Sequence, residues 1–161
     1  MTLYIPYYLL AQGVYSGIIN GISLITINTG KLIKSVYNHK NPDMNKHLQK
    51  LDIEYKLNLI ESIINFIPSN YDKNIDPIFI CLRGIKIAIE NVHNNLLQIN
   101  KKIAYHVTKW FSSWRTLNIK LLLNMLEMNV EILNNRFNDY VKTCQIYQFN
   151  YHHLKTIKES Q

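Results

Sequence analysis

Isoleucine, leucine and valine recur at alternating intervals of four and three residues from Ile78 to Ile103. This 3.5-residue period, kept for more than three heptads, places the side chains along one stripe of a single long helix. Asp76 and Pro77 precede the stripe in the order of an N-cap followed by proline at the first helical position. The helix therefore needs partners that cover its stripe, which consists of Ile78, Leu82, Ile85, Ile89, Val92, Leu96, Ile99 and Ile103.

Two more segments repeat the same alternation, one from Ile119 to Tyr147 and a shorter one from Ile53 to Ile67. The residues between the two long stripes include serines and a threonine that favour turns and caps, so an antiparallel hairpin is expected there. The shorter helix is predicted to begin after residues 41–43 and to end before Pro68. The stripes are Ile119, Leu123, Leu126, Val130, Leu133, Phe137, Tyr140, Cys144 and Tyr147, and Ile53, Leu57, Ile60, Ile64 and Ile67, with Leu48 and Leu51 extending the second.

These helices and an apolar first segment predict an all-α fold, an antiparallel four-helix bundle. The stripes alone would bury about twenty large side chains, each worth roughly 1.5–3 kcal/mol, which is enough to oppose chain entropy. We expect a first part, residues 1–40, to form an apolar glycine-bearing helix and turn that is packed on the bundle or released from it. Residues 41–150 are predicted to form the three-helix core, and residues 151–161 a polar C-terminal tail.

The first thirty residues contain no charged side chain, and glycine occupies every fourth position from Gly13 to Gly21. Gly13, Gly17 and Gly21 share one face of the helix predicted for residues 3–37. Glycine inside a helix costs about 0.5–1 kcal/mol relative to alanine, and close approach of another backbone would offset that cost. The helix could be buried in its own bundle, inserted in a membrane, or self-associated in water through this face. Its opposite flank is expected to carry Leu10, Val14, Ile18, Ile22 and Ile25.

The uncharged span could cross a hydrocarbon core of about 30 Å at about 1.5 Å per residue. Lys31, Lys34 and Lys40 follow it, where they would meet anionic headgroups on the cytoplasmic side. Polar residues within the span favour the buried alternative: they are Gln12, Ser16, Asn20, Ser23, Thr26, Asn28 and Thr29.

The net charge is +7, with lysines dispersed along the chain and only three arginines available for bidentate base contacts. This distribution argues against nucleic acid as a partner.

Cys81 and Cys144 are too few for a disulfide framework and are not spaced as a CxxC pair, which favours a reducing, cytoplasmic compartment. The opening residues also lack the basic region that precedes the apolar part of a secretory signal.

No combination of residues points to catalysis or metal binding. None of the six histidines is spaced with Cys, Asp or Glu as metal ligands are. Glu127 and Glu131 lie one turn apart without the Glu-x-x-His motif of di-iron bundles. Cys144 occupies a stripe position, typical of a buried thiol. We therefore predict no catalytic, metal or cofactor-binding residue and no cofactor, and we expect the chain not to be an enzyme.

A cluster of aromatic residues lies between the two long helices. Trp110, Phe111, Trp114 and Arg115 could plug the end of the core or form a patch that docks a partner, because tryptophan and arginine are prominent in interface energetics.

Two resemblances add to this interpretation. The stretch HVTKWFSSWRTLNIKLLLNMLEMNVEILNNRF, residues 106–137, together with the abundance of Asn, Ile and Lys, is similar to uncharacterised helical proteins of amoeba-infecting giant DNA viruses of the mimivirus kind. That resemblance implies no activity, and a location in the host cytoplasm or the virion. The order of elements resembles HeLo-type executioner domains, which implies a bundle that masks a membrane-active first helix.

Taken together, the sequence predicts a non-enzymatic helical bundle that acts as an assembly, scaffold or interaction module. Its expected partner is another protein or a second copy of itself. The alternative is a bundle that associates with anionic membranes by inserting its first helix.

Overall fold

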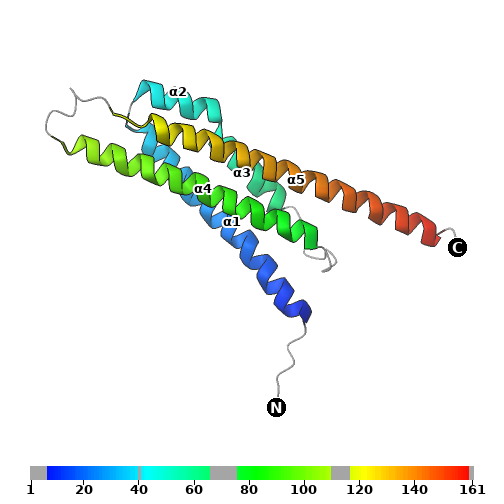
Figure 1. Ribbon diagram of the computed structural model, residues 1–161. Coiled ribbons are helices and arrows are strands. Elements are labelled where there is room, and N and C mark those ends of the chain that lie inside the picture. Colours follow the sequence, from blue (N-terminus) through cyan, green and yellow to red (C-terminus); the bar gives the residue numbers. More distant parts are fainter. Residues whose placement is uncertain (1–6, 40, 66–75, 110–116, 160–161) are drawn as a thin grey trace, which may run out of the picture.

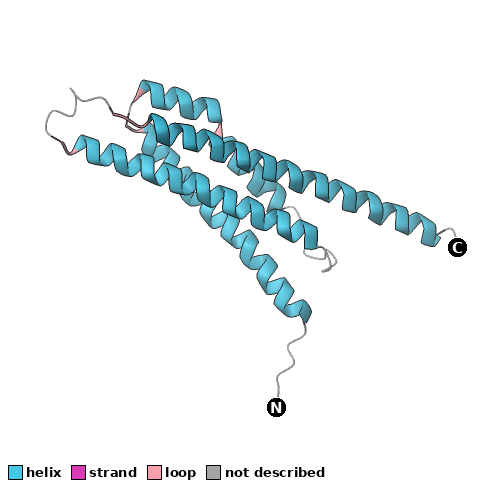
Figure 2. Ribbon diagram, viewed as in Figure 1, coloured by secondary structure: helices cyan, strands magenta, loops and turns pink. Residues whose placement is uncertain are grey.

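A computed structural model describes residues 7–39, 41–65, 76–109 and 117–159, with side-chain surroundings given for residues 16–39, 41–64, 77–109 and 117–146. The elements are α1 (Tyr7–Tyr37), α2 (Pro42–Leu51), α3 (Ile53–Asn65), α4 (Asp76–Val107) and α5 (Lys120–Glu159). The described ranges contain no strand, as Figure 2 shows, and the prediction of an all-α fold is confirmed. Helix α5 continues to Glu159, through most of the segment predicted as a C-terminal tail.

Helices α4 and α5 run antiparallel to each other (Figure 1). Cys81 Sγ lies 3.6 Å from Thr143 Oγ1, and Asn129 Nδ2 donates to Asn95 Oδ1 over 3.1 Å, so residue numbers rise along α4 as they fall along α5. Every member of the α4 stripe is buried, and so are the α5 stripe residues Ile119, Leu126, Val130, Leu133 and Tyr140. The partly buried Leu123, Phe137 and Cys144 pack against this core.

Helix α1 runs in the same direction as α4 and crosses it obliquely. Thr29 Oγ1 lies 3.1 Å from His93 Nδ1, and Ser35 Oγ donates to Asn100 Oδ1 over 3.2 Å, so the two helices keep a nearly constant register. The N-terminal end of α1 diverges from α4 and α5 in Figure 1. The contact between α1 and α4 is therefore carried by the C-terminal part of α1.

The buried stripe of α1 differs from the predicted apolar flank. Its members repeat at intervals of four and three, as in the other helices, but two of them are threonines. Thr29 satisfies its hydroxyl by donating to the Ile25 carbonyl over 2.7 Å and by its contact with His93. Among the members of the predicted flank whose surroundings are described, Ile22 is fully buried, and Ile18 and Ile25 are partly buried. The observed stripe is Ile22, Thr26, Thr29, Ile33 and Val36.

The prediction of one continuous helix between residues 41–43 and Pro68 is wrong, because the chain bends at Asp52. This residue adopts the left-handed conformation, with φ 48° and ψ 44°, and its N–H donates to the carbonyls of Leu48 and Gln49. Aspartate tolerates that conformation better than most residues. Helix α2 begins at Pro42, within the segment after which the start was predicted, and Asn41 caps it by accepting from Met44 N over 3.0 Å.

The bend has a physical reason in the spacing of apolar residues. Leu51 and Ile53 are two positions apart, which would place them on different sides of one continuous helix. The left-handed residue between them rotates α3 relative to α2, so that both side chains are buried. The described helices thereby contribute to one core, with α3 against α1 and α2 against α5.

Candidate interaction surface

No other helix packs closely against the glycine face of α1 at Gly17 or Gly21, its described positions. Gly17 is exposed, and a Cβ atom built there would have no neighbour within 4 Å. At Gly21 a Cβ would lie 2.9 Å from Lys86 Cε, the stem of a flexible side chain. Gly13 lies in α1, outside the residues whose side-chain surroundings are described. In the folded chain, therefore, neither Gly17 nor Gly21 is in close contact with a second backbone.

Replacing Gly17 by alanine is expected to raise the free energy of unfolding by about 0.5–1 kcal/mol, because the helix interior gains propensity and the added methyl meets open space. Gly21→Ala should gain less, since its methyl must displace the Lys86 stem, which is held in an ion pair with Glu90 at 2.7 Å. Urea unfolding of both variants measures the difference. A destabilised Gly17→Ala would mean that this face is covered.

Lys31 and Lys34, which follow the uncharged span, lie on the exposed side of α1. Lys31 is exposed, and Lys34 Nζ lies 3.7 Å from Glu54 Oε1, which links α1 to α3. Among the described residues, none of the helices combines the length and the hydropathy that a membrane span requires. Some predicted site residues fall outside the described residues: Lys40, Trp110, Phe111, Trp114 and Arg115.

Several polar side chains inside the bundle, such as Thr29 and Asn95, join helices. Within the described ranges, no group of three or more His, Cys, Asp or Glu residues could hold a metal ion. His93 joins α4 to α1 through Thr29.

Cys81 and Cys144 are free thiols, and burial raises the pKa of Cys144, with a smaller opposing effect of its hydrogen bond with Tyr140. A raised thiol pKa leaves less thiolate, so Cys144 is poorly suited to act as a nucleophile.

A shallow pocket of about 170 Å³ lies at the corner where α1 meets the α2–α3 bend. Its apolar side is formed by Ile33, Leu48 and Ile53, and Tyr37 and acidic residues stand at its rim. Burial, followed by the nearby carboxylates of Glu54 and Asp52, raises the pKa of Tyr37. Pockets that bind cofactors and drug-sized ligands usually measure about 300–1,000 Å³. The size and composition of this corner therefore do not indicate a substrate site.

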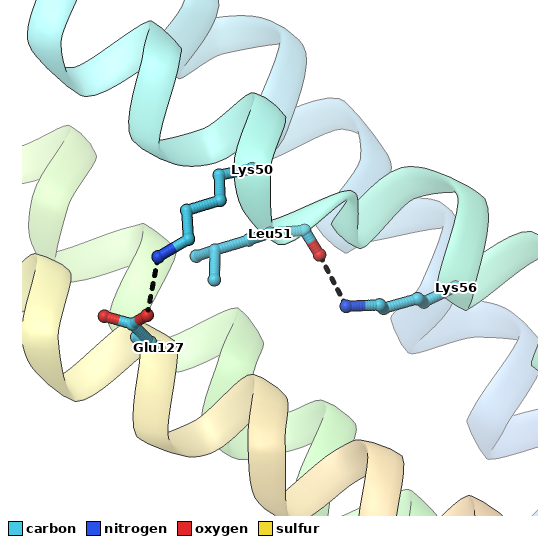
Figure 3. Close-up of polar contacts among 4 residues, drawn as sticks. All are labelled: Lys50, Leu51, Lys56 and Glu127. Atoms are coloured by element: carbon cyan, nitrogen blue, oxygen red, sulfur yellow. Dashed lines mark hydrogen bonds and ion pairs between the residues drawn. The ribbon is translucent and has the colours of Figure 1, made fainter.

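Figure 3 shows an ion pair between α2 and α5, and a hydrogen bond at the bend between α2 and α3. Lys50 Nζ lies 3.5 Å from Glu127 Oε1 on α5, and Lys56 Nζ donates to the Leu51 carbonyl over 2.7 Å at the bend. The ion pair is largely exposed, so it contributes at most about 1 kcal/mol. The position of this ion pair is more informative than its energy. The pair shows that α2 lies along one flank of α5, and the neighbouring face of α5 is not covered by α2.

That uncovered face carries an apolar stripe that sequence reasoning missed. Four large side chains repeat at intervals of four, three and four residues, so they share one face of α5. This face lies roughly opposite the buried stripe of Leu126, Val130 and Leu133, at 100° per residue. We call the four residues the outer stripe: Leu121, Met125, Met128 and Ile132, with exposed fractions of 71%, 40%, 62% and 43%.

The signal for the outer stripe is visible in the sequence LLLNMLEMNVEIL, residues 121–133. Apolar residues occupy two stripes there, each with the 3.5-residue period, and the core of one chain uses only one of them. Contiguous apolar residues exposed on a surface and bordered by polar ones mark interaction sites. The outer stripe is therefore the best candidate for a functional surface among the described residues.

The architecture and this surface define an all-α protein with an uncovered apolar helix face. No protein-family model matches the chain, and no solved structure matches it. The chain is 40% identical over 163 aligned residues to Uncharacterized protein L717 of Acanthamoeba polyphaga mimivirus, and the alignment covers 85% of this chain and 79% of the viral protein. The chain belongs to the family of that giant-virus protein.

This relationship confirms the predicted resemblance to uncharacterised proteins of giant DNA viruses. The resemblance to HeLo-type domains, by contrast, stays a prediction. The name of the viral relative states no activity, so the function of the chain has to be argued from its own surface.

Proposed function

We propose that this protein is a non-enzymatic assembly or interaction module, which binds another protein chain through the outer stripe of α5. The observation that carries this proposal is the exposure of Leu121, Met125, Met128 and Ile132 along one helix face. Full burial of such a side chain is worth roughly 1.5–3 kcal/mol, so covering the stripe would supply several kcal/mol toward association. A helix with apolar stripes on two sides is most stable when both are covered.

The charges beside the outer stripe favour a protein partner over a membrane. Lys120 and Arg136 supply positive charge next to it, whereas Glu127 and Glu131 supply negative charge. A helix that lies on an anionic membrane carries lysine and arginine along its polar face, and acidic residues there are repelled by the headgroups. A protein surface can complement both signs, which suits the mixed border of this stripe.

A photo-crosslinking amino acid at Met128, in the full chain expressed in Acanthamoeba cells, tests the proposal. We expect a discrete covalent adduct with a protein, either a second copy or another chain. The matched control carries the crosslinker at Ile80, which is 66% exposed on α4 and lies outside the outer stripe. Absence of adducts from position 128, or the same adducts from both positions, would contradict the proposal.

A further inference from the structure

We infer that the chain covering the outer stripe is a second copy of this protein, with the two α5 helices antiparallel about a two-fold axis near residues 126 and 127. The inference rests on the proposed function, since it names the partner of the same surface. It is argued from the order of side chains along the stripe, from the charges on its flank and from the extent of the apolar contact.

The outer stripe is complementary to itself when one copy is reversed. Antiparallel pairing sets Leu121 against the partner's Ile132 and Met125 against the partner's Met128. Each layer then joins two large apolar side chains, as facing layers do in antiparallel helix pairs with a 3.5-residue period. The same patch serves both copies, so the contact closes as a dimer and does not propagate into a filament.

The charges on one flank match this direction. Lys120 and Glu131 are eleven residues apart, about three helical turns, and so lie on the same side of the outer stripe. Two-fold antiparallel pairing brings like flanks together and places Lys120 near the partner's Glu131, once on each side of the axis. Both residues are exposed, and neither makes an ion pair within the described part of the chain. They are therefore available to a second copy.

A like-charge approach at the proposed axis is balanced within each chain. Glu127 lies near the proposed axis, where it would come close to the Glu127 of the second copy. In each chain Lys50 Nζ is 3.5 Å from its Oε1 (Figure 3), so the pairing brings together two ion pairs rather than two bare carboxylates. The position of α2 thus supports the dimer as well as the bundle.

The apolar contact is short. Beyond Ile132 the same face of α5 continues with Asn135 and Asp139, both exposed, so the stripe ends after about three turns. A contact of this length lies at the small end of protein interfaces, and we expect a dissociation constant of roughly micromolar order. Leu24 and Ile27 of α1 are also exposed, but two residues do not form a comparable stripe.

Sedimentation velocity on the full chain, from about 1 to about 100 µM, tests the dimer. We expect a concentration-dependent shift from monomer to dimer, and a weakening by at least about tenfold in Met128→Lys, because an unpaired charge would enter the contact. The matched control Ile80→Lys, on exposed α4 surface, should dimerise like the wild type. Circular dichroism of both variants checks that the helices are intact.

A charge exchange tests the direction of pairing. Lys120→Glu and Glu131→Lys should each weaken the dimer, because each places like charges together, and the double variant should recover the wild-type constant. Failure to recover would overturn the antiparallel register. A wild type that stays monomeric throughout would overturn the inference, and adducts of position 128 with a different protein would then leave the proposed function standing. A monomer without adducts would overturn both.

Discussion

Ile89→Ala is expected to lower the free energy of unfolding by about 2–5 kcal/mol. Ile89 is 0% exposed in the stripe of α4, the helix that packs against both α1 and α5. Truncation removes buried apolar area and leaves a cavity that three rigid helices cannot easily close. Urea unfolding followed by circular dichroism measures the loss.

Ile80→Ala is the matched control, because it makes the same change in the same helix. Ile80 is 66% exposed, so its truncation should change the free energy of unfolding by less than about 0.5 kcal/mol. Both variants change helix propensity by the same amount. The difference between their losses in the free energy of unfolding therefore reports the effect of burial. Equal losses, or a loss below about 1 kcal/mol for Ile89→Ala, would contradict the packing of α4.

The burial of α4 could be predicted residue by residue because each member of its stripe is aliphatic. A 3.5-residue period in such side chains has one physical solution, a helix with partners along that face. The same argument predicted the α5 stripe, in which Leu123, Phe137 and Cys144 are only partly buried. It failed at residues 51–53, where an interval of two requires the left-handed turn at Asp52.

In α1 the apolar pattern missed Thr29, because a hydroxyl group can be buried at small cost when it is hydrogen-bonded. The Thr29 hydroxyl donates a hydrogen bond to the Ile25 carbonyl and contacts His93. Thr29 therefore occupies a core position that hydropathy alone would assign to the surface. The glycine register did not determine which of its three predicted environments applies, and insertion in a membrane and self-association stay predictions. Small residues permit a close approach without requiring one, and Gly17 faces open space.

The outer stripe could not be assigned from a single chain. Each helix in a monomer needs one covered stripe, and the stripe of Leu126 and Val130 meets that need for α5. The second apolar period becomes meaningful once the bundle leaves it exposed. Candidate surfaces in helical proteins of this kind are thus found by subtracting the core from the apolar pattern.

Asn95→Ala is expected to lower the free energy of unfolding by about 1–3 kcal/mol. Asn95 is 4% exposed, donates from Nδ2 to the Leu122 carbonyl over 3.2 Å, and accepts from Asn129 Nδ2 over 3.1 Å. Its loss leaves the Asn129 amide without this acceptor between two packed helices. The adjacent Asn94 is exposed, so Asn94→Ala should be neutral or slightly stabilising, because alanine favours the helix.

A double-mutant cycle separates the hydrogen bond from general packing. If Asn95 and Asn129 act as a pair, Asn95→Ala combined with Asn129→Ala should cost less than the sum of the single variants, by about 0.5–3 kcal/mol. The second truncation then removes a donor that the first has already left unpaired, which reduces the penalty. Additive losses would show that the two amides do not interact. Buried polar pairs of this type can fix helix register, and non-additivity would place that role at the α4–α5 contact.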